Sequence, residues 1–326
     1  MGDWKTSSVL VTGGTGLVGS WLIERLLREG ANVSCLVLDS DPGSALMRSG
    51  NINKVSVING NLSDIDVVSR AVNHQACDTI FHLGAQTIVG TALQDPLDTF
   101  NSNIKGTWNV LEVARRSNGL VKRLVVASSD KAYGHSKVLP YTEDMHLHGS
   151  GPYDVSKSAT DLLAQSYGKT YNLPIAVARC GNIYGGGDLN WSRIVPGTIK
   201  SLLANNTPII RSNGKYLRDY IHVEDIVDAY MHTAESVEKL SLKGDAFNFS
   251  RNEPLSVLEI YEEISKATVK NVVKPKILNS SQNEIVDQYL DSSKAKKILG
   301  WKSNINLQVG LEKTVAWYRE YFNERD

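Results

Sequence analysis

The amino-acid sequence predicts an α/β protein with a doubly wound parallel sheet and a smaller mixed α/β lobe towards its C-terminus. Two observations predict this fold: apolar strand-like runs alternate with amphipathic helix-like segments, and a glycine-rich turn joins the first strand to the first helix. Right-handed crossovers restrict such an alternation to a sheet covered by helices on both faces. With 326 residues, the chain is long enough for a large domain and a smaller lobe.

The strand-like and helix-like segments follow one another regularly as far as Arg179. Predicted strands are Val9–Thr12, Val33–Leu38, Lys54–Ile58, Thr79–Leu83, Arg123–Ser128 and Ile175–Arg179. Predicted helices are Leu17–Glu29, Ile65–Asn73, Pro96–Asn118 and Tyr153–Tyr171. Later elements are a helix at Ile194–Asn205, strands at Pro208–Arg211 and Ala246–Phe249, a strand–helix pair at Tyr220–Glu235 and a helix at Leu307–Phe322. We expect residues 1–179, joined by about 219–248, to form the sheet domain, and 180–218 and 249–326 to form the lobe.

Charge and composition argue against several classes of partner. Lysine and arginine together number 35, as do aspartate and glutamate, so no net field favours nucleic acid or an anionic membrane. No apolar run approaches the length of a membrane span and no signal-like stretch begins the chain, so we expect a cytoplasmic protein. The cysteines, Cys35, Cys77 and Cys180, are far apart, which is typical of a reducing compartment, and they lack the spacing of a metal site. We therefore predict no metal.

The glycine-rich turn has the run Thr12-Gly13-Gly14-Thr15-Gly16-Leu17-Val18-Gly19. Glycines at a helix start let backbone N–H groups approach a pyrophosphate, where the helix dipole favours negative charge. Asp39 follows the second predicted strand, where a carboxylate hydrogen-bonds a ribose 2′-hydroxyl and repels a 2′-phosphate. The spacing therefore predicts a Rossmann-type site for NAD rather than NADP. The predicted cofactor contacts are Gly13, Thr15, Gly16, Leu17, Val18, Gly19, Asp39, Asn61, Leu62, Leu83, Ala85 and Gln86.

A second pattern places Tyr153 and Lys157 four residues apart, so that they share one face of a predicted helix. A neighbouring ammonium stabilises a phenolate, which lowers the tyrosine pKa from about 10. We therefore expect Tyr153 to act as a base on a substrate hydroxyl while a hydride leaves the same carbon. Ser129, which follows a predicted strand, is expected to hydrogen-bond the same substrate oxygen. An ordinary helix surface is the alternative explanation of the spacing alone.

Together these motifs resemble those of the extended short-chain dehydrogenase/reductase family. The matching segments are Thr12–Gly19, Asp39, Phe81–Gln86, Asn103–Thr107, Ser128–Gly134, Tyr153–Lys157, Arg179–Gly185 and Arg218–Val223. The resemblance implies Tyr153 as the base, and Lys157 as its electrostatic partner and as a ligand of the cofactor ribose. It also implies a nucleotide-diphosphate sugar as substrate in the second lobe, and a homodimer formed through a helix bundle.

Asp130 and Lys131 follow the strand-end serine, an order that resembles the nucleotide-sugar 4,6-dehydratases of this family. These enzymes oxidise C4, remove the C5 proton, expel the C6 hydroxyl as water and return the hydride to C6. The resemblance implies Asp130 as the general acid and Lys131 as the C5 base, where many relatives carry glutamate. The run Gly181–Asp188 and the segment Arg193–Pro196 resemble the CDP-glucose 4,6-dehydratases, whereas Arg218–His222 resembles the wider family.

Four residues are candidates for binding the substrate. Guanidinium groups pair bidentately with phosphate oxygens, which predicts diphosphate contacts for Arg193, Arg211 and Arg218, and Asn182 is a further candidate. Two other functions remain open. One is a nucleotide-sugar 4-epimerase or related oxidoreductase that uses Tyr153 in the same way, without loss of water. The other is a non-catalytic NAD-binding scaffold, which would show no hydride transfer.

Overall fold

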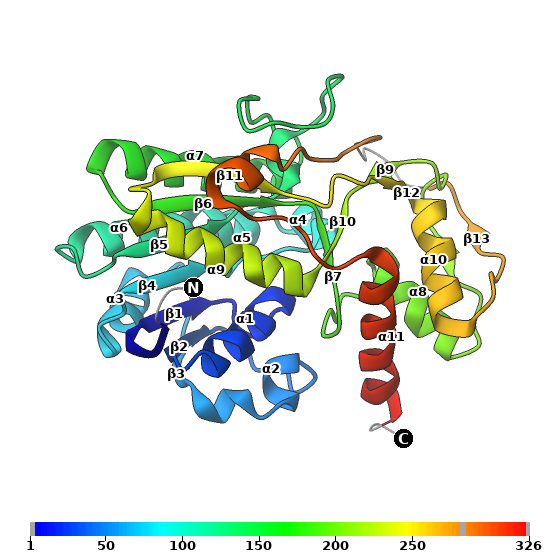
Figure 1. The fold of residues 1–326 in the computed structure, drawn as a ribbon, viewed down its shortest axis with the longest axis horizontal. Helices are drawn as coiled ribbons and strands as arrows, with labels where there is room; N and C mark the ends of the chain where they lie inside the picture. Colours follow the sequence, from blue (N-terminus) through cyan, green and yellow to red (C-terminus); the bar gives the residue numbers. More distant parts are fainter. Residues whose placement is uncertain (1–3, 281–284, 324–326) are drawn as a thin grey trace.

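The computed structural model describes residues 4–280 and 285–323. Its central element is a seven-stranded parallel sheet in the order β11-β6-β5-β4-β1-β2-β3 (Figure 1). These strands are β1 (Ser8–Thr12), β2 (Asn32–Val37), β3 (Ser56–Asn59), β4 (Thr79–His82), β5 (Arg123–Ala127), β6 (Ile175–Cys180) and β11 (Lys243–Phe249). The strand order reverses between β1 and β4. A crevice at such a reversal, beyond the carboxyl ends of the strands, is where open α/β sheets bind ligands.

Helices cover both faces of the sheet (Figure 1). One layer consists of α1 (Leu17–Arg28) and α9 (Val223–Lys239), and the other of α3 (Ile65–His74), α6 (Gly106–Arg116) and α7 (Pro152–Tyr171). Successive side chains of a strand point to opposite faces, so Val9 and Val11 pack with the α1 layer and Leu10 packs with the α3 layer. This arrangement confirms the predicted doubly wound α/β fold.

Most of the remaining elements build a lobe beside the carboxyl edge of the sheet, whereas α2, α4 and α5 belong to the sheet domain (Figure 1). The additional strands are β7 (Asn182–Tyr184), β8 (Ile209–Ile210), β9 (Leu217–Arg218), β10 (Tyr220–His222), β12 (Leu255–Ser256) and β13 (Lys276–Ile277). The additional helices are α2 (Ala45–Arg48), α4 (Val89–Gln94), α5 (Pro96–Phe100), α8 (Ile194–Leu203), α10 (Val257–Val269) and α11 (Leu307–Asn323). Helices α8, α10 and α11 share a separate apolar core that includes Ile199, Ile264 and Leu311.

The predicted helix Pro96–Asn118 is interrupted in the structure. A π-helical turn at Asn101–Lys105 separates α5 from α6. Within this turn the buried Asn103 exchanges hydrogen bonds with the backbone of Gln86, at 2.7 and 2.9 Å, and donates to Ser156 Oγ at 2.8 Å. The irregular turn thereby joins the segment after β4 to α7. The pattern of apolar residues continues regularly through the turn, so the sequence does not reveal it.

Three further findings concern the described residues. None of their helices is long and apolar enough to cross a membrane. They contain no group of three or more His, Cys, Asp or Glu side chains arranged to hold a metal ion. Cys35, Cys77 and Cys180 are buried free thiols.

Candidate active site

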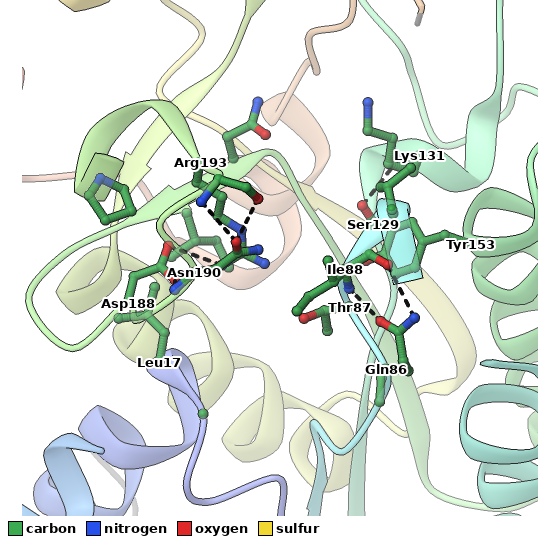
Figure 2. Close-up of a pocket in the computed structure, with 18 of the residues that line it drawn as sticks. Leu17, Gln86, Thr87, Ile88, Ser129, Lys131, Tyr153, Asp188, Asn190 and Arg193 are labelled. Atoms are coloured by element: carbon green, nitrogen blue, oxygen red, sulfur yellow. Dashed lines mark hydrogen bonds and ion pairs between the residues drawn. The ribbon is translucent and has the colours of Figure 1, made fainter. Parts of the chain in front are cut away.

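A pocket of about 1800 Å³ opens at the carboxyl edge of the sheet, between the sheet and the lobe. In Figure 2 its labelled side chains form two groups: Leu17, Asp188, Asn190 and Arg193 on one side, and Gln86, Thr87, Ile88, Ser129, Lys131 and Tyr153 on the other. Every residue that the sequence nominated for catalysis, cofactor binding or substrate binding lines this pocket. The fold therefore brings the nominated residues together at the predicted crevice.

The glycine turn forms the floor of the pocket beside β1 and β4. Gly13 has φ +71°, and a Cβ there would lie 2.8 Å from the backbone of Gly84. A Cβ on Gly19 would lie 2.2 Å from the carbonyl oxygen of Gly13, so the start of α1 can approach the turn only without side chains. Gly16 occupies the N-cap of α1 and carries no side chain to cap it. The first N–H groups of α1 are therefore suited to an anion.

Thr12 links the ends of the two strands that flank the strand-order reversal. Its hydroxyl lies 2.9 Å from His82 Nδ1 and accepts the backbone N–H groups of Leu83, at 3.1 Å, and Gly84, at 3.0 Å. Burial lowers the pKa of His82 to about 3, so the ring is neutral and serves as a structural hydrogen-bonding partner. These bonds fix the glycine turn against the segment after β4.

The other predicted cofactor contacts lie along the same edge. Asp39 is exposed two residues after β2, and Asn61 follows β3 with its side-chain oxygen accepting the N–H of Ser63 at 2.8 Å. Gln86 lines the pocket beside Ile88 (Figure 2), but its amide nitrogen donates to the backbone oxygen of Ile88 and the hydroxyl of Thr99, each at 3.1 Å. The side chain of Gln86 therefore fixes the loop that it belongs to.

Tyr153 and Lys157 lie in the first two turns of α7 and line the pocket together. Lys157 Nζ donates to the carbonyl oxygen of Ala127 at 3.0 Å, and burial lowers the pKa of this ammonium to about 8. Burial also raises the pKa of Tyr153 to about 12, with Arg193 as the largest opposing influence. Desolvation of the phenol therefore outweighs the nearby positive charge of Arg193, and the lowering of the tyrosine pKa by Lys157 stays a prediction.

Ser129, Asp130 and Lys131 occupy the turn after β5. Ser129 Oγ donates to Asp130 Oδ1 at 2.9 Å, while Asp130 Oδ2 is buried with no hydrogen-bond partner among the described residues. Burial raises the pKa of the Asp130 carboxyl above its usual range, although the Lys131 ammonium opposes the shift. Lys131 Nζ donates to the side-chain oxygen of Gln288 at 2.6 Å. The turn thus carries a carboxyl with a raised pKa and an amine held by a neutral amide.

The candidate substrate residues differ in how far their polar groups are already engaged. Arg193 pairs with Asp188 at 3.0 Å and remains 40% exposed. Arg211 Nη1 donates to the carbonyl oxygen of Ser192 at 2.9 Å. The guanidinium of Arg218 is buried and donates to the carbonyl oxygens of Leu217 at 2.8 Å, Val286 at 2.6 Å and Ile285. Asn182 donates to the carbonyl oxygen of Asp219 at 3.1 Å. Of the three arginines, Arg193 and Arg211 are the more available to a ligand.

Sequence reasoning missed other residues of the site. Asp188, Asn190 and Trp191 line the pocket, and the preceding glycine run was the available signal for this loop. Gln288 is completely buried and contacts Lys131 across 157 residues of sequence, so no local pattern could have identified it.

Curated relatives match nearly the whole chain. One relative, from Arabidopsis thaliana, is 28% identical over 98% of this chain, which spans 48% of that longer protein. It is a trifunctional UDP-glucose 4,6-dehydratase/UDP-4-keto-6-deoxy-D-glucose 3,5-epimerase/UDP-4-keto-L-rhamnose-reductase. The CDP-glucose 4,6-dehydratase of Salmonella typhimurium is 28% identical, over 99% of this chain and 93% of its own length.

Solved structures show the same fold. The UDP-glucose 4-epimerase of Thermotoga maritima, solved with UDP-glucose, has a TM-score of 0.87 at 26% identity and covers 97% of this chain and 99% of its own. The dTDP-glucose 4,6-dehydratase of Bacillus anthracis, solved in complex with NAD, has a TM-score of 0.84 at 22% identity and covers 98% of this chain and 100% of its own. The sequence model of the family described as GDP-mannose 4,6 dehydratase matches residues 10–314. This chain therefore belongs to that family, within the extended short-chain dehydrogenase/reductases that include NAD-dependent nucleotide-sugar dehydratases and epimerases.

Proposed function

We propose that this protein is an NAD-dependent nucleotide-sugar 4,6-dehydratase, similar to those that act on CDP-glucose. The observation that carries the proposal is the carboxyl of Asp130, which is 3% exposed in a turn that faces the same pocket as Tyr153. Because burial raises the pKa of Asp130, the group retains a proton more readily than an ordinary carboxyl. Expulsion of a sugar hydroxyl as water requires such an acid, whereas epimerisation at C4 does not.

NAD is the cofactor in this proposal, and the residues present fit it. Gly13 and Gly19 have no Cβ, so the turn at the start of α1 leaves its backbone N–H groups accessible to a pyrophosphate. Asp39 lines the same pocket at the strand end where a carboxylate hydrogen-bonds the ribose 2′-hydroxyl of NAD. Bound NAD supplies a hydride acceptor that carries a positive charge. The same pocket extends from the glycine turn to Tyr153 and Lys157, so one ligand can reach both.

The proposed chemistry divides the proton transfers among three side chains and uses a fourth to bind the substrate oxygen. Tyr153 takes the proton of the C4 hydroxyl, with the hydroxyl of Ser129 hydrogen-bonded to the same oxygen. Lys131 takes the C5 proton, and Asp130 gives its proton to the departing C6 hydroxyl, which leaves as water. Since burial raises the pKa of Tyr153 to about 12, positive charge must help to remove its proton. Lys157 and Arg193 are cations that line this pocket.

In this proposal the lobe binds the nucleotide diphosphate. Arg193, Arg211 and Asn182 contact the phosphates, while Arg218 supports the pocket wall because its N–H groups already bind backbone carbonyls. We assign residues 1–179 and 219–248 to the NAD-binding domain, and 180–218 and 249–326 to the nucleotide-sugar lobe. The pairing of β11 with β6 and the separate core of α8, α10 and α11 support this division. Residues 1–3, 281–284 and 324–326 of these ranges lie outside the described residues.

The proposal includes a cytoplasmic homodimer. Exposed apolar side chains on the outer surfaces of α6 and α7 support the dimer: Trp108 is 42% exposed and Leu162 is 54% exposed. Light scattering should give twice the mass of one chain, and Leu162→Glu should shift it towards a single chain. The three buried free thiols support a reducing compartment.

One experiment tests the catalytic proposal. Purified protein is incubated with CDP-, dTDP-, GDP- and UDP-hexoses, and the product mass is followed. Loss of one water from the sugar, greatest with CDP-glucose, is the expected result. An isomeric sugar of unchanged mass would instead support a 4-epimerase, the second candidate, because a solved 4-epimerase shares this fold over nearly the whole chain. Absence of both products and of any NADH signal would support a binding scaffold.

A further inference from the structure

We propose that Gln288 is a positioning residue that holds the Lys131 amine in place for proton transfer at C5. The inference rests on the proposed function, because Lys131 is the base of that reaction. The side-chain oxygen of Gln288 accepts a hydrogen bond from Lys131 Nζ at 2.6 Å. Lys131 itself stands beside Ser129 and Tyr153 in the pocket (Figure 2). The amide thus contacts the one atom of Lys131 that would receive the proton.

The backbone around Gln288 makes this acceptor rigid. Its N–H donates to the carbonyl oxygen of Leu217 at 3.0 Å, and the residue pairs with Arg218 in an isolated β-bridge. Arg218 in turn donates to the carbonyl oxygens of Ile285 and Val286, so the segment before Gln288 is attached to β9. A fixed acceptor restricts a long, flexible lysine side chain to one orientation.

Packing alone does not account for a glutamine at this position. The side chain of Gln288 is completely buried, and its amide nitrogen has no hydrogen-bond partner among the described residues. Burying an unsatisfied donor is unfavourable, and an apolar side chain of similar size would fill the space without that penalty. The hydrogen bond from Lys131 gives the amide a role that packing does not.

The charges around Lys131 explain why the partner is a neutral amide. Two carboxyls act on its ammonium, Asp130 from the same turn and Asp154 from α7, and Arg218 also acts on Asp130. A further carboxylate at position 288 would hold the proton on Lys131 more firmly, because opposite charge favours the ionised form. An amide orients the amine while leaving it better able to exist as the free base.

Two variants of Gln288 separate positioning from packing. Gln288→Met preserves the volume and removes the acceptor, whereas Gln288→Glu preserves the acceptor and adds a charge. Gln75→Met is the matched control, because Gln75 is a partly buried glutamine that bonds Ser34 and Ser56 away from the pocket. C4 oxidation is read as NADH absorbance in a single turnover, and C5 proton removal as deuterium incorporation from D₂O.

Gln288→Met should slow C5 exchange by about tenfold or more and leave C4 oxidation within about twofold. Gln288→Glu should move the pH midpoint of C5 exchange upward by about one unit, because the carboxylate stabilises the ammonium. Gln75→Met should change neither rate. Equal loss of both steps in Gln288→Met would show a merely structural role, and unchanged C5 exchange would show no role; either result overturns the inference.

A substrate-free measurement separates this inference from the proposed function. Trace acetic anhydride acetylates free amines, and mass spectrometry of the Lys131 peptide against pH gives the titration midpoint of that amine. The midpoint should be higher in Gln288→Glu than in the unaltered protein and lower in Gln288→Met. Identical midpoints in all three proteins would overturn the inference. If the unaltered protein dehydrates none of the four nucleotide hexoses, the proposed function fails, while the labelling midpoints still show whether Gln288 acts on Lys131.

Discussion

Arg179 donates through Nε and Nη2 to both carboxylate oxygens of Asp161, at 2.8 and 2.9 Å, in a pair whose side chains are 2% and 0% exposed. Its third nitrogen, Nη1, donates to the hydroxyl of Tyr133 at 2.7 Å. The pair therefore joins β6 to α7, and Tyr133 joins both to the turn that carries Asp130. This buried contact therefore fixes the turn of Asp130, the proposed acid, against α7, which carries Tyr153, the proposed base for the C4 hydroxyl.

Removal of the guanidinium should destabilise the fold strongly. Arg179→Met leaves the Asp161 carboxylate buried and unpaired, and we expect a loss of about 3 to 5 kcal/mol in the free energy of unfolding in urea. Arg116→Met is the control: Arg116 pairs with Glu112 but is 64% exposed, so its loss should change stability by less than about 1 kcal/mol. Similar losses in the two variants would contradict the special role of the buried pair.

Tyr153→Phe should abolish hydride transfer, because phenylalanine cannot accept the C4 hydroxyl proton. We expect a loss of about 100-fold or more in NADH formation during a single turnover. Tyr171→Phe is a suitable control, because Tyr171 is the last residue of the same helix and is half exposed. If both variants transfer hydride at the parent rate, Tyr153 is not the base.

Asp130→Asn should allow C4 oxidation but stall elimination. An amide has no proton to give the departing hydroxyl, so NADH should accumulate while the sugar retains its water, and dehydration should fall by about 100-fold. Since burial raises the pKa of Asp130, dehydration by the parent should decline as pH rises through that raised pKa. Full turnover by Asp130→Asn, measured by product mass, would refute the acid role.

Asp39→Ser should weaken the preference for NAD over NADP. The carboxylate accepts a hydrogen bond from a ribose 2′-hydroxyl and repels a 2′-phosphate, so its loss removes both effects. We expect the ratio of the two Kd values, measured by calorimetry, to change by about tenfold or more in favour of NADP. Asp41→Ser, a nearby change at a residue that does not line the pocket, should leave the ratio unchanged.

Asp219 should make stability depend on pH. Burial raises the pKa of this carboxyl to about 7 from an ordinary value of 3.8. Because the folded pKa is the higher one, the contribution of Asp219 to stability is complete below about pH 4 and is lost as pH rises to about 7. Relative to the parent, Asp219→Asn should therefore gain roughly 1 to 4 kcal/mol between pH 4 and 7, with no further gain above. The free energies of unfolding in urea are compared at a series of pH values. A difference between Asp219→Asn and the parent that stays constant with pH would contradict this prediction.

Local sequence signals identified most of the framework. Each predicted strand of the sheet lies within three residues of the observed bounds, because parallel strands buried on both faces need continuous apolar runs. The exception among the early helices was Pro96–Asn118, where apolar periodicity continues through a π-helical turn. That turn depends on the contacts of Asn103 with Gln86 and Ser156, which are distant in sequence.

The amino-acid sequence by itself identified many of the residues that line the pocket, because glycine turns, strand ends and the four-residue spacing of Tyr153 and Lys157 are local features. Only the tertiary structure decided how those residues are tuned. Burial raises the pKa of Tyr153 to about 12. Packing of distant segments places the side-chain oxygen of Gln288 against the Lys131 amine. Desolvation and contacts between distant segments arise only when the whole chain packs, so no window of sequence contains them.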